Sequence, residues 1–299
     1  MEIHGWLILD KPLGFSSTQV VGKIRRSLRV KKIGHVGTLD PLATGVLVVA
    51  VGEATKLIPF LPTGPKIYDF VVRWGEARDT DDAEGKVIHT SSVLPTLKAI
   101  QGAVKNFVGT LDQVPPLYSA IKNQGQPAYK TARKGGIPPL NKRSVTIYDL
   151  KIMESIDLAT TRFQVKCAGG TYVRALARDL ALYLGTYGHV QDLRRLKDGL
   201  FSIQDTICME KFSEVVHKSE DYPFLKSIET VLDDIPAVLL SSRDCQRIRQ
   251  GLDIEADVYG IETSNLSMFS LFYDHSLVAM AVLQERRLYP RRVFNLNLL

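Results

Sequence analysis

The stretch GHVGTLDPLATG, residues 34–45, presents one carboxylate on a loop with a strongly constrained backbone. Its glycines permit backbone angles and close approaches that other residues resist. Pro41 fixes its own φ and keeps Asp40 out of the helical region. The pattern therefore predicts a loop shaped around Asp40, although Asp-Pro also initiates ordinary turns and glycine also punctuates them.

Basic and apolar segments flank this loop. Downstream, residues 46–51 form an unbroken apolar run that Gly52 ends, which is typical of a buried strand. Upstream lie the basic residues Arg25, Arg26, Arg29, Lys31 and Lys32. An acid between a basic segment and a core strand indicates a candidate nucleophile that faces an anionic substrate.

Length and composition predict a globular protein with a sizeable core. A chain of 299 residues suggests roughly two domains, and 45% of its residues are hydrophobic. The longest apolar run is far shorter than the ~18 residues that indicate a membrane span. Residues 1–5 lack the pattern of a signal peptide, so we expect a cytoplasmic protein.

The three cysteines, Cys167, Cys208 and Cys245, are widely spaced. Their spacing indicates neither a disulfide framework nor a paired zinc site. Cys167 alternates within a strand-like run, so we expect it to be a small core residue.

The net charge of +6 is unevenly placed. Between Asp112 and Asp149 the sequence has no acidic residue, and Tyr118 and Tyr129 lie in the same segment. Its basic residues are Lys122, Lys130, Arg133, Lys134, Lys142 and Arg143. Cations interleaved with aromatic residues suit a polyanion whose bases can stack, so residues 112–148 are predicted to be an RNA-binding insert. The alternative is a solvated surface loop.

Hydrophobic periodicity alternates between strand and helix over the first two thirds of the chain. Strands are expected over 6–10, 46–51, 68–74, 86–88 and 162–167, and helices over stretches that include 20–28, 94–107 and 173–184. If Thr171 caps the last helix, Arg174 lies in its first turn. A cation there opposes the helix dipole by a few tenths to ~1 kcal/mol unless an anion meets it. Arg174 is therefore placed for a partner, either Asp40 or a phosphate.

The pattern changes near residue 236 to short strands, over 238–240, 270–273, 277–283 and 292–295, with a hairpin turn at Asp274-His275. We expect a small all-β domain over 236–299, a first domain over 1–235 and a linker within 218–234.

Six motifs together resemble the TruB-type pseudouridine synthases. They are LDKPLGFSS (9–17), GHVGTLDPLATG (34–45), KIY (66–68), SAIK (119–122), GGTYVR (169–174) and HVQDLRRL (189–196). The resemblance covers about residues 6–200, and RIRQG (247–251) with LVAMAV (277–282) is weakly similar to the RNA-binding PUA domain. It implies an α+β fold, with a mixed, mostly antiparallel sheet flanked by helices and loops, and a small β-barrel-like C-terminal domain.

The resemblance also implies an activity. This family isomerises the uridine at position 55 in the T arm of transfer RNA. Asp40 would attack the target nucleoside or its ribose while the glycosidic bond breaks, and the freed uracil would rejoin through C5. Neither a metal nor an organic cofactor is implied. The expected partner is tRNA, without a membrane, and the expected state is a monomer.

Further roles follow from the resemblance rather than from spacing. Tyr68 would stack on the flipped base and assist proton removal from C5, and Leu193 would pack on the other side of the base. Arg174 would keep the catalytic carboxylate ionised, since a nearby cation lowers an acid's pKa. His35 would wedge into the RNA stem, because flipping a base costs a few kcal/mol. Asp82 would support Arg174 or the loop.

Two other function classes are open at this point. Residues 34–37 fit the GxxG loop of a KH domain, which would require a helix after the second glycine. A hydrolase would pair Asp40 with a carboxylate of the 79–82 cluster across a glycosidic bond. Its product would be free uracil, whereas isomerisation leaves the RNA intact.

Overall fold

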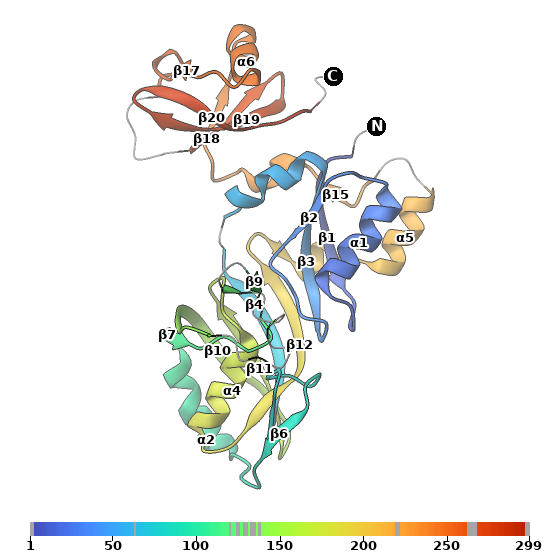
Figure 1. The fold of residues 1–299 in the computed structure, drawn as a ribbon, viewed down its shortest axis with the longest axis vertical. Coiled ribbons are helices and arrows are strands. Elements are labelled where there is room, and N and C mark those ends of the chain that lie inside the picture. Colours follow the sequence, from blue (N-terminus) through green and yellow to red (C-terminus); the bar gives the residue numbers. More distant parts are fainter. Residues whose placement is uncertain are drawn as a thin grey trace.

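The computed structural model describes residues 3–62, 64–119, 121–123, 126–127, 131, 136, 139–218, 222–261 and 268–296. Within these residues the chain forms an 11-stranded sheet, a five-stranded sheet and two small two-stranded ribbons. Helices accompany both larger sheets (Figure 1). The predicted α+β class is therefore confirmed.

The large sheet is mixed and mostly antiparallel. Its main path runs β14 (Ile207–Cys208), β1 (Gly5–Lys11), β3 (Ala43–Val51), β12 (Gly188–Asp198), β4 (Lys66–Trp74), β11 (Thr160–Cys167), β10 (Arg143–Asp157) and β7 (Gly109–Gln113). Beside this path, β2 (Ile33–Val36) pairs with β3, β13 (Phe201–Ser202) with β12, and β15 (Leu225–Lys226) with β1. Pairing is parallel between β3 and β12 and between β1 and β14.

The helices of the large sheet pack on one of its faces. They are α1 (Ser17–Leu28), α2 (Leu97–Val104), α4 (Val173–Tyr183) and α5 (Met209–Lys218), with short 3₁₀ helices η1 (Gly52–Phe60), η2 (Lys105–Phe107) and η3 (Ile203–Asp205) elsewhere. Ser16 caps α1 in a capping box with Gln19, and Val20 and Ile24 are buried one turn apart. Apolar spacing and a cap thus explain why this segment is helical.

The central strands are buried on both faces, which explains their unbroken apolar runs. In β1, Leu7 and Leu9 pack into the core beneath the helices. Trp6 and Ile8, on the opposite face, belong to a second core that also contains Met280 of the five-stranded sheet. The two sheets therefore share a core along β1 and β3, and β3 is the strand that follows the Asp40 loop.

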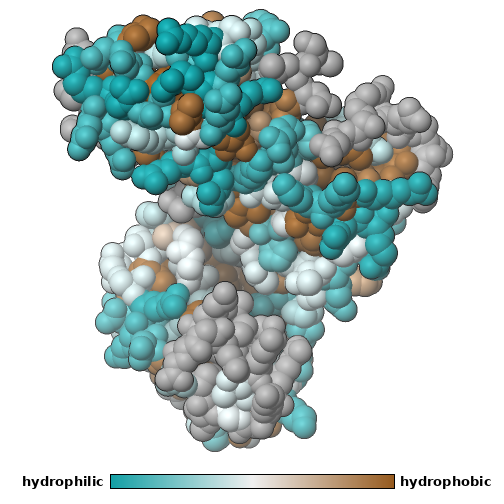
Figure 2. All heavy atoms as spheres, turned by 45° about the horizontal axis from the view of Figure 1, so that its top comes forward, coloured by the Kyte–Doolittle hydropathy of each residue, from teal (hydrophilic) through white to brown (hydrophobic). Residues whose placement is uncertain are grey.

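The five-stranded sheet has the order β16 (Ala237–Leu239), β18 (Met268–Tyr273), β19 (Ser276–Gln284), β20 (Arg287–Val293) and β17 (Ile254–Glu255). Helix α6 (Ser242–Arg249) and η5 (Asp257–Tyr259) accompany it. Asp274 and His275, at φ 46° and 61°, form the predicted two-residue hairpin turn, whose left-handed angles match the strand twist. Figure 2 shows a largely hydrophilic outer surface on this unit and hydrophobic surface along the junction beneath it.

A linker was expected somewhere within residues 218–234, and much of the described part of this range packs on the large sheet. β15 pairs with β1. The indole N–H of Trp6 donates a hydrogen bond of 3.1 Å to the carbonyl of Ile228, the first residue of η4 (Ile228–Val231). Ile228 and Val231 are buried in the shared core. β15 and η4 therefore pack with the large sheet.

The remaining strands form the ribbons β5 (Glu76–Arg78) with β6 (Val87–Thr90) and β8 (Lys122–Asn123) with β9 (Gln126–Pro127).

No helix among the described residues is long and apolar enough to span a bilayer.

Candidate active site

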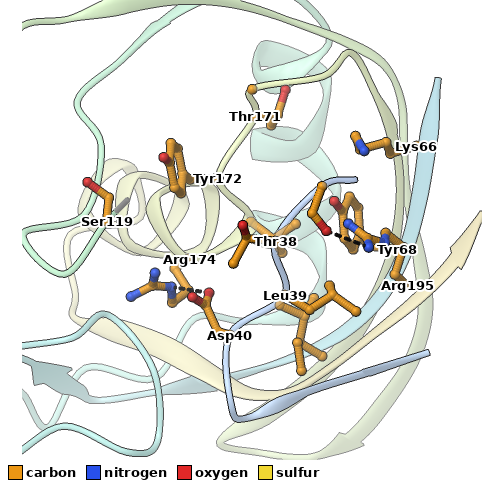
Figure 3. Close-up of a pocket in the computed structure, with 15 residues that line it drawn as sticks. Thr38, Leu39, Asp40, Lys66, Tyr68, Ser119, Thr171, Tyr172, Arg174 and Arg195 are labelled. Atoms are coloured by element: carbon orange, nitrogen blue, oxygen red, sulfur yellow. Dashed lines mark hydrogen bonds and ion pairs between the residues drawn. The ribbon is translucent and has the colours of Figure 1, made fainter. Parts of the chain in front are cut away.

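A cavity of about 250 Å³ opens where β4 and β12 meet the Asp40 loop and the start of α4. Of the residues predicted to act, Asp40, Tyr68, Arg174 and Leu193 line it. Figure 3 places Asp40 and Arg174 at one side of this space and Tyr68 at the other. Four residues that are far apart in sequence thus meet at one cavity.

Buried hydrogen bonds hold the Asp40 loop. Lys11 is fully buried, and its ammonium donates to the carbonyls of Phe15 at 2.5 Å, Pro12 at 2.9 Å and Pro41 at 3.4 Å. Burial lowers the pKa of Lys11 to about 8, and nearby Asp40 opposes that shift. The hydroxyl of Ser17 donates to the Leu39 carbonyl at 3.0 Å and accepts from its N–H at 2.8 Å. The carboxylate is therefore presented on a rigid support.

Two glycines of the loop are required by their geometry. Gly37 has φ +63° and Gly45 has φ +97°, both in the region that favours glycine. A Cβ on Gly45 would lie 2.2 Å from the Arg195 carbonyl oxygen. Gly34 instead pairs with Ala50 in the β2–β3 ladder.

Arg174 contacts the catalytic candidate directly. Its Nε lies 2.9 Å from Oδ2 of Asp40, and its side chain is 4% exposed. Its other nitrogens donate to the Thr80 carbonyl at 2.8 Å and the Tyr118 carbonyl at 3.0 Å. Asp82 lies 3.5 Å away and is also buried. The arginine is thus held in place by groups other than Asp40.

The expected helix cap was wrong. α4 begins at Val173 with Tyr172 as its N-cap, and no side chain caps it. Gln113 instead holds the backbone of Tyr172, accepting from its N–H at 2.9 Å and donating to its carbonyl at 3.1 Å. Arg174 does lie in the first turn, and Asp40 supplies the anion that this position calls for.

The electrostatics of Asp40 differ from the expectation. Burial raises the pKa of the Asp40 carboxyl, the Arg174 guanidinium lowers it, and the nearby Asp82 raises it further, with a net rise. The Asp40 side chain is nevertheless 35% exposed, because it opens into the cavity. Arg174 therefore orients the carboxylate and opposes its protonation without overcoming the desolvation.

Tyr68 is buried on β4 and lines the far wall of the cavity. Burial raises its pKa to about 12, and the neighbouring Arg195 guanidinium opposes this rise. The phenol is therefore neutral near pH 7. Leu193, 5% exposed on β12, lines the same cavity.

Two predicted residues do not line the cavity. Asp82 is buried behind Arg174, and its carboxylate accepts from the Thr80 hydroxyl at 2.6 Å and the Glu84 N–H at 3.1 Å. His35 lies on β2 opposite Val49, and its Nδ1 is buried without a hydrogen-bond partner among the described residues. Burial lowers the pKa of His35.

The predicted RNA-binding residues are only partly described. Lys142 and Arg143 are exposed, and Arg143 begins β10. The backbone of Lys122 lies in β8. Tyr129, Lys130, Arg133 and Lys134 lie outside the described residues.

Sequence reasoning did not assign catalytic or binding roles to several cavity residues. Lys66 and Arg195 line the cavity beside Tyr68, and Ser119, Thr171 and Tyr172 line its other side. All five occur in the quoted motifs. Alternate residues of a strand share a face. Lys66 lies two residues before Tyr68, and Arg195 lies two residues after Leu193, so the sequence could have predicted that both line the same cavity.

The structure disfavours both alternative function classes. A strand, β3, follows the loop after Gly37, where a KH domain requires a helix. None of the carboxylates at 79–82 lines the cavity, and Arg174 lies between Asp40 and Asp82. The described residues also contain no group of three or more His, Cys, Asp or Glu side chains that could hold a metal ion.

Comparisons with known proteins identify the family of this chain. Residues 25–173 match the model of the TruB family pseudouridylate synthase N-terminal domain, and residues 174–238 match that of the tRNA pseudouridylate synthase B C-terminal domain. The chain is 43% identical over 299 residues to tRNA pseudouridine synthase B of Rhodospirillum rubrum, covering 98% of this chain and 97% of that protein. The corresponding protein of Rhodopseudomonas palustris is 42% identical, with 99% and 82% covered.

Solved structures share the fold. A chain of a Cbf5-Nop10-Gar1 complex superposes with a TM-score of 0.71 at 24% identity, covering 97% of this chain and 84% of that one. A chain of an H/ACA RNP bound to a substrate RNA containing 2'-deoxyuridine superposes with a TM-score of 0.70 at 22% identity, covering the same shares.

Proposed function

The chain belongs to the TruB family of tRNA pseudouridine synthases, and we propose that it isomerises the uridine at position 55 in the T arm of transfer RNA. The observation that carries the proposal is the Asp40–Arg174 pair, which opens into a cavity with Tyr68 on the far wall. An oriented carboxylate facing an aromatic ring suits a base that has been flipped out of its stack.

In the proposed reaction, Asp40 acts on the target nucleoside while the N1–C1′ bond breaks. The uracil then turns, a C5–C1′ bond forms, and the proton on C5 leaves. Arg174 orients the carboxylate, and its contacts with the Thr80 and Tyr118 carbonyls support that role. Asp82 supports Arg174 from behind.

Tyr68 and Leu193 pack on the two sides of the uracil in this proposal. Because the pKa of Tyr68 is about 12, its hydroxyl takes part in C5 deprotonation as a neutral group that passes a proton on, directly or through water. His35 acts outside the cavity, as the wedge that fills the space left in the RNA stem.

Binding of the tRNA is assigned to two further parts of the chain. The basic insert at 112–148 contributes phosphate contacts, and the exposure of Lys142 and Arg143 supports this assignment. We place the domain boundary near residue 236, where the five-stranded sheet begins, and assign RNA binding to residues 236–299. The enzyme acts as a monomer without a cofactor.

The decisive experiment incubates the protein with unmodified tRNA and maps pseudouridine by chemical modification and primer extension. A single stop in the T loop, absent with Asp40→Asn, is the expected result. Modification confined to another arm would refute the proposed target, and release of free uracil would refute isomerisation.

A further inference from the structure

A second group of buried charges lies across the cavity from Asp40 and Arg174. Lys66, Asp198 and Arg195, here called the cationic triad, meet where β4 pairs with the end of β12. The Asp198 carboxylate contacts the Lys66 ammonium, and its Oδ2 lies 3.2 Å from Nη1 of Arg195. The side chains of Lys66, Asp198 and Arg195 are 15%, 8% and 1% exposed.

The two groups have opposite formal charge. Lys66 and Arg195 contribute two cations against the single carboxylate of Asp198. Around Arg174, the three carboxylates of Asp40, Asp82 and Glu84 face the two cations of Arg174 and Lys11. Figure 3 shows Lys66, Arg195 and Tyr68 together on one side of the cavity, with Asp40 and Arg174 on the other. The cavity therefore has one wall with an excess positive charge and one wall with an excess negative charge.

Neutral groups surround the cationic triad, so its excess charge is not cancelled. Burial raises the pKa of the neighbouring Cys167 thiol to about 11 and that of the Tyr68 phenol to about 12, which leaves both uncharged near neutral pH. Burial lowers the pKa of Lys66, and the Asp198 carboxylate opposes that shift. Asp198 therefore favours the charged form of Lys66.

The nitrogens of the Arg195 guanidinium are occupied by contacts with other groups of the protein. Its Nε donates to the Val46 carbonyl at 2.7 Å, and Nη2 donates to the Gly37 carbonyl at 2.8 Å. Its Nη1 faces Asp198. The Lys66 ammonium has three donors, and among the described residues only Asp198 accepts a hydrogen bond from it. Lys66 is thus the member of the triad with donors available to a molecule in the cavity.

This distribution of charge matches one step of the proposed isomerisation, on which the inference rests. When the N1–C1′ bond breaks, its electron pair stays on N1, so the uracil detaches as an anion with charge spread over its carbonyl oxygens. C1′ becomes electron-poor on the side of Asp40. The ring then supplies an electron pair from C5 to C1′, which gives a neutral adduct that still carries the proton on C5. Loss of the C5 proton and protonation of N1 complete the isomerisation with no net gain or loss of protons.

We infer that the Lys66 ammonium contacts the detached uracil and stabilises its negative charge, and that Asp198 and Arg195 position that ammonium. Fixed charges aimed at a site where charge develops lower the barrier without reorganisation. Lys66 is by this inference a further catalytic residue.

The test compares Lys66→Met with Lys66→Arg in the full-length protein on unmodified tRNA. Lys66→Met keeps the length of the side chain, and the buried Asp198 loses one cationic partner but keeps the other, Arg195. Loss of one preorganised stabilising group predicts a single-turnover rate at saturating enzyme that is about 10²- to 10³-fold lower. The Kd for tRNA in filter binding should stay unchanged, and Lys66→Arg should recover most of the rate.

Lys166→Met is the matched control. Lys166 is an exposed lysine on the neighbouring strand β11 and is paired with Ile67, so its substitution removes a cation without touching the cavity. We expect its rate to equal that of the unsubstituted protein.

Three results would overturn the inference. These are a Lys66→Met rate at saturation close to that of the unsubstituted protein, a defect confined to Kd, or a Lys66→Arg rate as low as that of Lys66→Met. Pseudouridine formed outside the T arm would refute the proposed target instead, while the comparison of rates would still decide the role of Lys66.

Discussion

Gly37→Ala should be among the most damaging single-methyl additions in this chain. Gly37 has φ +63°, where a side chain costs roughly 1–2 kcal/mol. A Cβ there would lie 2.7 Å from Asp198 Oδ2, 2.9 Å from Lys66 Nζ and 3.0 Å from Arg195 Nη1. These atoms are the ends of side chains, but they are ion-paired with one another and Arg195 is also bonded to two carbonyls.

The neighbours therefore cannot move without breaking the cationic triad. Forcing an extra carbon into a packed site costs typically 1–3 kcal/mol, so the total loss in the free energy of unfolding should be about 2–5 kcal/mol. Gly185→Ala supplies the matched control, because Gly185 has φ +72° and nothing within 4 Å of its added Cβ. It should lose only the backbone contribution of roughly 1–2 kcal/mol.

Urea denaturation followed by circular dichroism measures both values, and a single-turnover assay on tRNA reports the effect on Asp40 three residues away. We expect Gly37→Ala to unfold at a clearly lower urea concentration than Gly185→Ala and to lose activity. Equal midpoints for the two variants would show that the triad yields to a methyl group, and the argument from close packing would be refuted.

Three further predictions concern the reaction and RNA binding. Asp40→Asn removes the charge but keeps the size of the side chain, so isomerisation should be undetectable while filter binding of tRNA is nearly unchanged; a near-normal single-turnover rate would contradict the assignment of Asp40. Tyr68→Phe should slow product formation and tritium release from C5-labelled uridine by ~10²- to 10⁴-fold. Because the pKa of Tyr68 is about 12, this factor should be constant from about pH 6 to 9, and a factor that grows with pH would show that the phenol ionises in that range. Replacing Lys142 and Arg143 with Gln should weaken tRNA binding. The slope of log K against log salt should fall by up to about 1 for each phosphate that is no longer neutralised. An unchanged slope would show that these side chains do not contact phosphates.

The Asp40 loop and its partner were accessible to sequence reasoning because their signals are local. Pro41 and the surrounding glycines mark the loop, and a cation in the first turn of a helix calls for an anion, which Asp40 supplies. The cationic triad was not accessible, because it depends on the register between β4 and β12. That register pairs Asp198 with Lys66 and Arg195 with Tyr68, and it contains bulges that spacing along one strand does not reveal.

The wrong helix cap and one undetected strand pairing also have physical causes. Thr171 has the side chain of a helix cap, but a tertiary contact from Gln113 to Tyr172 takes over that task. Within 218–234, where a linker was expected, short apolar stretches between polar residues did not reveal that β15 pairs with β1. In both places long-range contacts decided the local structure.

The core shared by the two sheets bears on how far this enzyme is modular. Trp6 and Ile8 of β1 and Val46 and Val48 of β3 pack in the same core as Met280 of the C-terminal sheet. A chain cut after residue 235 would therefore expose apolar surface on β1 and on β3, the strand that follows the Asp40 loop. The C-terminal unit therefore cannot be exchanged between relatives by itself. The residues that it packs against β1 and β3, and the residues of β1 and β3 that face it, would have to change together.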